Sequence, residues 1–244
     1  VVYSDVFRPH DLLLICKRGY PDYPDQDIEK LIRFVVELDT NVVQYRRFGA
    51  QGSPWEFNLR DTLRWLQLLT AKHGLLPAGT AQDFLDIVFT QRFRSPTDRQ
   101  AVYDLFSAVF ATNVQERDRF HNLSSRSFQV GLGCVQRNLG LQPNDDPGHC
   151  VLNSHLAAME ALMICVQQSW PVILVGPSGA GKTKLIEQLA ANTGADPVSF
   201  SLNADIDAMD LVGGYEQVDP SRQVNAFLAK LRRYFQVYLL DHLS

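Results

Sequence analysis

The sequence predicts a mixed α/β fold in which a small helical bundle precedes a phosphate-binding domain built on a parallel sheet. Apolar residues recur at helical spacing through residues 1–112, and the pattern G-x-x-x-x-G-K-[ST] follows at 176–183. Strand-like runs at 171–175 and 197–202 lie on either side of this pattern and the helix that follows it. A strand, a loop, a helix and a second strand in this order imply parallel strands joined by a crossover helix.

The bulk composition is that of a globular protein. Hydrophobic residues make up 45% and charged residues 20% of the 244 positions, which argues against a largely disordered chain and allows one or two domains. The formal net charge of −4 gives no general electrostatic footprint for nucleic acid, so we expect no direct nucleic-acid site. No apolar run approaches the ~20 residues that a membrane span needs.

The first residues bear on whether the chain is part of a longer polypeptide, and the cysteines bear on its cellular compartment. Val1 to Asp5 contain no Met and no signal-peptide pattern, so we expect a piece of a longer polypeptide. The cysteines stand at no metal-ligand spacing, which favours buried free thiols and a reducing compartment, the cytosol or the nucleus. They are Cys16, Cys134, Cys150 and Cys165.

Residues 1–112 are expected to be helical, with loops between the helices. A long amphipathic helix is predicted by apolar residues at helical spacing. These are Ile28, Leu31, Ile32, Val35, Leu38 and Val42. Asn58, with Asp61 three positions later, predicts the start of the next helix. Thr80 begins another, and Ser95-Pro96 is a strong start signal for a further one.

The rest of the chain is expected to form a linker and a second domain. Residues 113–150 are polar and loop-rich, with one strand-like run at 127–132 and a Pro/Asp/Gly stretch at 143–148. This length is unusual for a connection inside one compact unit and favours two domains. Residues 151–244 then predict a helix at 154–168, the strand at 171–175, the loop, and a helix that ends near Asn192 with Gly194 beyond it.

The phosphate loop carries the most specific chemistry. It consists of Gly176, Pro177, Ser178, Gly179, Ala180, Gly181, Lys182 and Thr183. Its glycines bring backbone N–H groups close to phosphate oxygens, and the helix N-terminus adds partial positive charge. Lys182 supplies a full charge for the β- and γ-phosphates, and the Thr183 hydroxyl is a natural Mg²⁺ ligand. An ordinary glycine turn with a surface lysine would not explain the joint placement of strand, lysine and threonine.

Hydrolysis would need a carboxylate that holds Mg²⁺ and a group that orients water. The run Val237 to Asp241 resembles a strand ending in such an acid. However, residues 223–243 contain no Gly or Pro, and their apolar positions recur at helical spacing, so one long amphipathic helix is the preferred prediction. The catalytic acid is then not in this chain, and we expect the chain alone to bind ATP but hardly hydrolyse it.

Three further segments are specific enough to compare with known families. They are residues 53–61, S-P-W-E-F-N-L-R-D with Arg64-Trp65 after them, residues 169–177, S-W-P-V-I-L-V-G-P, which lead into the phosphate loop, and residues 211–219, L-V-G-G-Y-E-Q-V-D, beyond it. These segments, in this order, resemble those of the midasin family, the giant dynein-related AAA+ ATPases of ribosome assembly.

The resemblance implies a helical AAA+ lid at 1–112, a linker with a short strand at 113–150, and the N-terminal part of the next module's large domain at 151–244. It implies ATP as the nucleotide at 176–183. It also implies that Arg60 reaches the γ-phosphate of the upstream module, although Arg60 is equally compatible with a surface arginine or an ion pair with Asp61 or Asp5. In such linkers the main chain near Val130 to Gly133 passes the adenine.

The resemblance also implies partners and a location. They are neighbouring AAA+ modules of the same polypeptide, the pre-60S ribosomal particle with its assembly factors, and the nucleus. Ring-wide ATP hydrolysis would then remove assembly factors from that particle. The alternative is a module that binds nucleotide to stabilise the ring without hydrolysis. A kinase or a GTPase is not supported, because the sequence has no guanine-reading N-K-x-D motif and no kinase element.

Overall fold

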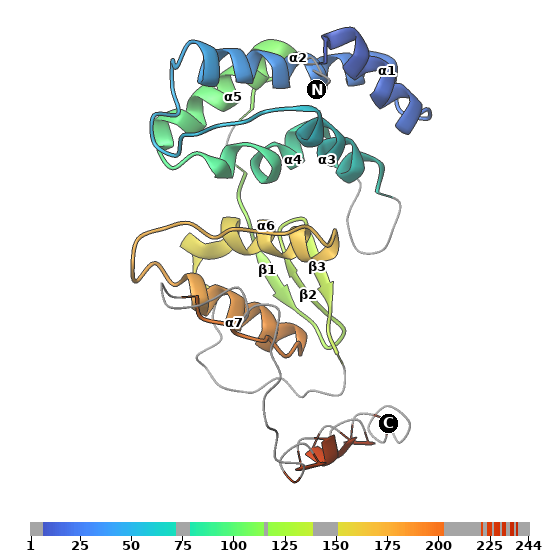
Figure 1. The fold of residues 1–244 in the computed structure, drawn as a ribbon, viewed down its shortest axis with the longest axis vertical. Helices are drawn as coiled ribbons and strands as arrows, with labels where there is room; N and C mark the ends of the chain where they lie inside the picture. The colour runs from blue at the N-terminus through green and yellow to red at the C-terminus, as the bar shows by residue number, and fades with distance from the viewer. Residues whose placement is uncertain are drawn as a thin grey trace, which may run out of the picture. The chain divides into compact units, whose positions relative to one another are not determined.

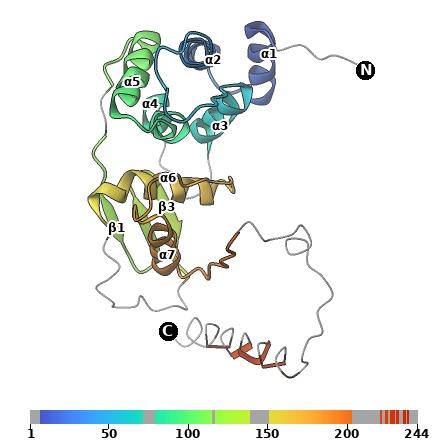
Figure 2. The same cartoon turned by 60° about the vertical axis from the view of Figure 1, so that its left-hand side comes forward.

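The computed structural model describes residues 7–71, 79–114, 117–138 and 151–202, together with single positions between 221 and 238. The chain divides into two compact units, Val1–Asp118 and Arg119–Ser244. Figures 1 and 2 show the elements of each unit from two directions.

The described part of the first unit is a helical bundle. Its elements are α1 (Pro9–Gly19), α2 (Asp25–Asp39), a π-helical turn η1 (Thr40–Gln44), α3 (Leu59–Thr70), α4 (Ala81–Val88), a 3₁₀ turn η2 (Thr90–Arg92) and α5 (Pro96–Phe110). The predicted helix starts are confirmed: Asn58 and Thr80 precede α3 and α4 with capping boxes, and Ser95 precedes α5. The long helix predicted through Val42 is shorter in the structure: α2 ends at Asp39, and residues 40–44, including Val42, form the π-helical turn η1.

The bundle core is aromatic. The Phe34 ring lies edge-to-face against Trp65, with 5.5 Å between the ring centroids, and makes similar contacts with Phe89 and Phe106 at 5.3 and 5.7 Å. All four side chains are at most 1% exposed, and the indole Nε1 of Trp65 donates to the Ala81 carbonyl oxygen at 3.1 Å. Large buried rings of this kind supply much of a small domain's apolar burial, and here they join α2, α3 and α5 to Phe89, the residue that follows α4.

The second unit contains a small antiparallel sheet where the sequence predicted one strand. β1 (His121–Leu123) pairs with β2 (Ser127–Val130), and β2 pairs with β3 (Gly133–Gln136). The alternation of Phe128 and Val130 marked β2, whereas β1 is exposed along its whole length and has no apolar face to predict it from. The stretch 143–148 lies outside the described residues.

Two helices pack with this sheet and complete the described core of the unit. They are α6 (Leu156–Gln167), which follows a 3₁₀ turn η4 (Asn153–His155), and α7 (Lys182–Thr193). Figure 1 shows α6 lying across β2 and β3, and α7 beside them. The core residues are Phe128, Val130, Val151, Leu156, Met159, Leu162, Met163, Leu185 and Leu189. The predicted helices at 154–168 and after the loop are confirmed, as is Gly194 as the left-handed cap that ends α7.

The predicted parallel strands are not formed within the described part of the chain. Strand pairing there is confined to β1, β2 and β3, and both 171–175 and 197–202 lack regular secondary structure. Ile173 is 87% and Val198 98% exposed, so no strand covers them, although Leu174 packs against the core. A parallel strand is stabilised by hydrogen bonds to its neighbours, and an apolar run alone does not supply those neighbours.

The C-terminal part is described at single positions, and these are helical. They run from Ser221 to Tyr238 and include Phe227 and Phe235, which are exposed. Tyr238 is helical, which favours the predicted helix over a strand at 237–241, while Asp241 itself and the segment 211–219 lie outside the described residues. No helix among the described residues is long and apolar enough to span a membrane.

Candidate phosphate-binding site

The predicted phosphate loop forms an exposed turn that leads directly into α7. Residues 176–180 are exposed, and the amide of Ala180 donates to the Pro177 carbonyl oxygen at 3.3 Å. Gly179 and Gly181 have φ angles of +80° and +74°, a region that residues with a Cβ rarely adopt. Glycine at positions 179 and 181 is therefore required by the backbone path of this turn.

The loop presents hydrogen-bond donors to an anion. Within the described part of the chain, the amides of Gly179 and Gly181 have no protein acceptor. The first intrahelical bond of α7 runs from the Leu185 amide to the Gly181 carbonyl at 2.8 Å, so the amides before Leu185 point out of the helix end. Such donors, with the positive end of the helix dipole, form a site for phosphate oxygens.

The lysine and threonine of the motif lie at this helix end. The Lys182 Nζ donates to the carbonyl oxygens of Gly176 and Pro177, both at 2.8 Å, so the ammonium group lies against the turn itself. Phosphate oxygens entering the turn would compete with these carbonyls for the ammonium group. Thr183 is exposed on the first turn of α7, where its hydroxyl can reach a cation beside the phosphates. The residues present thus match a nucleotide phosphate chain with Mg²⁺.

The segment that follows β3 holds the C-terminal end of α7. The Arg137 Nε donates to the Asn192 carbonyl oxygen at 2.8 Å, and the Asn138 amide donates to the Thr193 carbonyl oxygen at 2.9 Å. Cationic donors near the last carbonyls of a helix stabilise its end. Together with the burial of Leu185 and Leu189, these bonds fix the direction in which α7 presents its N-terminus.

A buried ion pair joins the sheet to α6. The Arg119 Nε lies 2.7 Å from the Glu160 Oε2, and the two side chains are 6% and 0% exposed. The Leu132 amide donates to the other oxygen, Oε1, at 2.7 Å. Sequence reasoning missed this pair, although a single acid in the otherwise apolar run 156–166 was a usable signal, because an acid is almost never buried without a partner.

This pair bears on the expected adenine contact near Val130 to Gly133. The Gly131 amide donates to the Phe120 carbonyl oxygen at 2.9 Å, and the Leu132 amide is taken by Glu160. Val130 and Gly133 are paired across the turn between β2 and β3. The main-chain donors of Gly131 and Leu132 therefore hold the unit together, which gives no support to adenine binding through them.

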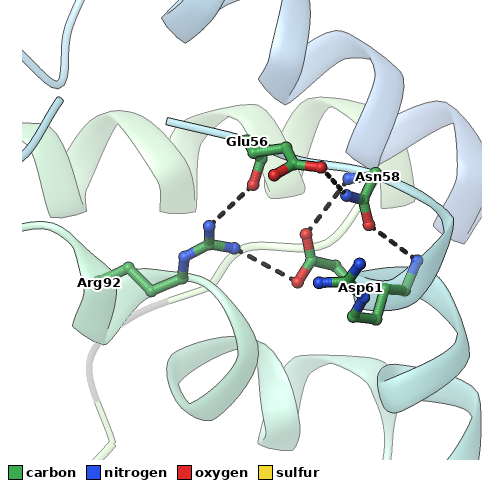
Figure 3. Close-up of polar contacts among 5 residues, drawn as sticks. Glu56, Asn58, Asp61 and Arg92 are labelled. Carbon is green, nitrogen blue, oxygen red and sulfur yellow. Dashed lines mark hydrogen bonds and ion pairs between the residues drawn. The ribbon is translucent and has the colours of Figure 1, made fainter. Parts of the chain in front are cut away.

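Arg60, the residue expected to reach a nucleotide of another module, lies at the start of α3 with an exposed side chain. Its amide donates to the Asn58 Oδ1 at 2.9 Å. The ion pair expected as the alternative is made by another arginine: Arg92 Nη1 lies 3.4 Å from Asp61 Oδ1, and its Nη2 donates to the Glu56 carbonyl oxygen (Figure 3). Asp5, the other proposed partner of Arg60, lies outside the described residues.

The described cysteines form no disulfide; Cys16 and Cys134 are buried, as expected, whereas Cys165 is only partly buried. Burial raises the pKa of the Cys16 thiol to about 11, and burial also raises the pKa of Cys134, with a hydrogen bond from Ser127 opposing the shift. A raised pKa leaves the unreactive thiol form at neutral pH. No cluster of three or more metal-ligating side chains occurs among the described residues.

Comparison with known proteins places both units. Residues 11–113 match the family described as the Midasin AAA lid domain, and residues 171–242 match the AAA domain of the dynein-related subfamily. The chain is 32% identical over 241 residues to a protein of Dictyostelium discoideum named Midasin, and 30% identical over 238 residues to one of Giardia intestinalis with the same name. Each match covers 89% of this chain but only 4% and 5% of those proteins.

Proposed function

Because this chain belongs to the midasin family of AAA proteins, with a lid domain followed by an AAA domain, we propose that residues 176–183 bind ATP with Mg²⁺. The observation that carries the proposal is the geometry of the loop. Four features meet at the N-terminus of α7. They are the left-handed conformations of Gly179 and Gly181, the amides of these two residues, the ammonium group of Lys182 against the turn, and the exposed Thr183.

Each part of the loop has its own task in this proposal. The amides of Gly179 and Gly181 orient the phosphates, Lys182 neutralises charge on the β- and γ-phosphates, and Thr183 would hold the Mg²⁺. Bound Mg²⁺ supplies charge neutralisation on the phosphate oxygens. The acid that would complete hydrolysis is expected outside this chain, so the chain alone should bind ATP and hardly hydrolyse it.

The wider role is proposed from family membership. The chain spans about 4–5% of the length of the two midasins, so it would act with neighbouring AAA modules of a longer polypeptide. We propose that ATP turnover in such a ring remodels pre-60S ribosomal particles in the nucleus by removing assembly factors. Arg60, exposed on the lid, would serve the nucleotide of the upstream module. The alternative is a module that binds nucleotide for ring stability without hydrolysis.

Substitution of two lysines in the same helix tests the binding proposal. Lys182→Ala removes the ammonium group from the turn, and we expect ATP affinity in the presence of Mg²⁺ to fall roughly 10–100-fold, since a hydrogen bond to a charged group contributes about 1.5–3 kcal/mol. Lys184→Ala is the matched control, because Lys184 is exposed and pairs at 3.7 Å with Glu187. Equal ATP affinities for the wild type and the two variants, measured by calorimetry, would refute the assignment.

The same substitution separates the two roles in the longer protein. If this site hydrolyses ATP, Lys182→Ala should lower both nucleotide occupancy at the site and the ATPase rate of the ring. If the site only stabilises the ring, occupancy should fall while the rate stays the same. Counting bound nucleotides after rapid gel filtration, beside a steady-state ATPase assay, distinguishes these outcomes.

A further inference from the structure

A histidine from outside the phosphate loop lies against Gly181, the residue that caps the start of α7. A Cβ placed on Gly181 would lie 2.8 Å from the Cε1 of His155 and 3.5 Å from its Nε2. The imidazole therefore occupies the space that a side chain at 181 would need. This contact joins the loop to the start of α6, because His155 is the last residue of the turn η4 and directly precedes that helix.

A hydrogen bond and the packing of the next residue hold the backbone of His155. Its amide donates to the Leu152 carbonyl oxygen at 2.8 Å, and the next residue, Leu156, is 6% exposed and starts α6. Leu156 belongs to the same core cluster as Leu185 and Leu189 of α7. The starts of α6 and α7 are thus held by a shared core, and the half-buried ring of His155 fills the space between η4 and the loop.

The conformation of Gly181 is one that such support can stabilise. It has a φ of +74° and accepts the first intrahelical hydrogen bond of α7. Glycine reaches many backbone conformations at little cost, so nothing in the residue itself keeps Gly181 in the left-handed conformation. A ring packed beside Gly181 excludes other backbone conformations of this residue and so keeps the next residue, Lys182, at the turn.

We propose that His155 is a positioning residue of the phosphate loop. By packing against Gly181 it preorganises the loop amides and Lys182 for phosphate, and so it raises nucleotide affinity without touching the nucleotide. The inference rests on the proposed function, since it assigns a support to the same site. It depends on the shape of the ring and not on its nitrogens or its charge.

Shape dependence gives a test in which a second aromatic ring should restore binding. ATP affinity with Mg²⁺ is measured on the full chain for the wild type, His155→Ala and His155→Phe, with circular dichroism as the check of folding. We expect His155→Ala to weaken ATP binding about tenfold, by analogy with residues that orient metal ligands, and His155→Phe to bind nearly as the wild type does. Leu152→Ala, at a 55% exposed position of the same segment, is the control and should not change affinity.

A second comparison shows whether His155 acts through the loop. In a Lys182→Ala background, His155→Ala should weaken binding much less than it does in the wild type, because the group that it positions is gone. If the wild type binds ATP and His155→Ala binds it equally well, the positioning role of His155 is wrong, while the proposed function of the loop stands. Equal weakening by Ala and Phe would also overturn it. A wild type that does not bind ATP would overturn the proposed function as well.

Discussion

Removal of the Arg119 guanidinium should selectively destabilise the second unit. Arg119→Met keeps most of the apolar stem but leaves the Glu160 carboxylate, which is 0% exposed, without the cation 2.7 Å away. The Leu132 amide would still donate to that carboxylate. Loss of one partner of a buried pair typically costs about 3–5 kcal/mol, and we expect about 3 kcal/mol here because one strong donor remains.

Native-state hydrogen exchange read by mass spectrometry is suited to this test, because it reports the two units separately. Amides of β2 and α6 should lose about 3 kcal/mol of protection, whereas those of α2 and α5 should be unchanged. Glu187→Gln, which breaks a surface pair whose side chains are 55% and 56% exposed, is the control and should cost at most about 0.5 kcal/mol. A loss below about 1 kcal/mol in β2 and α6, or an equal loss in both units, would refute the reasoning.

Two further predictions concern the first unit. Asn58→Ala removes the side chain that caps α3 through the Arg60 amide and should lower the free energy of unfolding by about 1 kcal/mol in urea titrations, while Asn58→Ser should retain most of it. Cys16 should react with iodoacetamide at pH 8 only after unfolding, because burial raises its pKa from 9.0 to about 11. Because the folded state holds the Cys16 proton more tightly than the unfolded state, the neutral thiol contributes to stability fully below pH 9.0. This contribution, at most about 2–3 kcal/mol, should be lost as the pH rises through about 11. Cys16→Val should not show this loss. Rapid labelling of native Cys16, or identical alkaline profiles for the two proteins, would contradict this.

Local signals in the sequence predicted the starts of the helices and the need for glycine in the turn before α7. Caps such as Asn58 and Ser95 act within one turn, so the residues that start a helix are neighbours in sequence. The loop motif likewise contains its own geometric requirements, since glycines at 179 and 181 are what the left-handed backbone needs. These features depend on interactions over a few residues and can be recognised without a structure.

Features that depend on distant partners were predicted less well. The run 171–175 has the composition of a buried strand, yet Ile173 is 87% exposed, because a strand also needs neighbours that its own sequence does not specify. The contact of His155 with Gly181 joins positions 26 apart in sequence, and no pattern links them. The partner of Asp61 is a further example. The sequence suggested the nearby Arg60, but the ion pair is made by Arg92, because η2 comes close to α3 only in the folded bundle.

The central claim is that residues 176–183 form a phosphate-binding loop, and the backbone amides of that loop test it most directly. In a ¹⁵N-labelled chain titrated with ATP and Mg²⁺, the amide resonances of Gly179, Gly181 and Lys182 should shift and saturate together, with those of α2 and α5 unchanged. The same titration of Lys182→Ala should saturate at much higher ATP concentration. Loop amides that stay in place at saturating ATP, or shifts confined to other parts of the chain, would contradict the account.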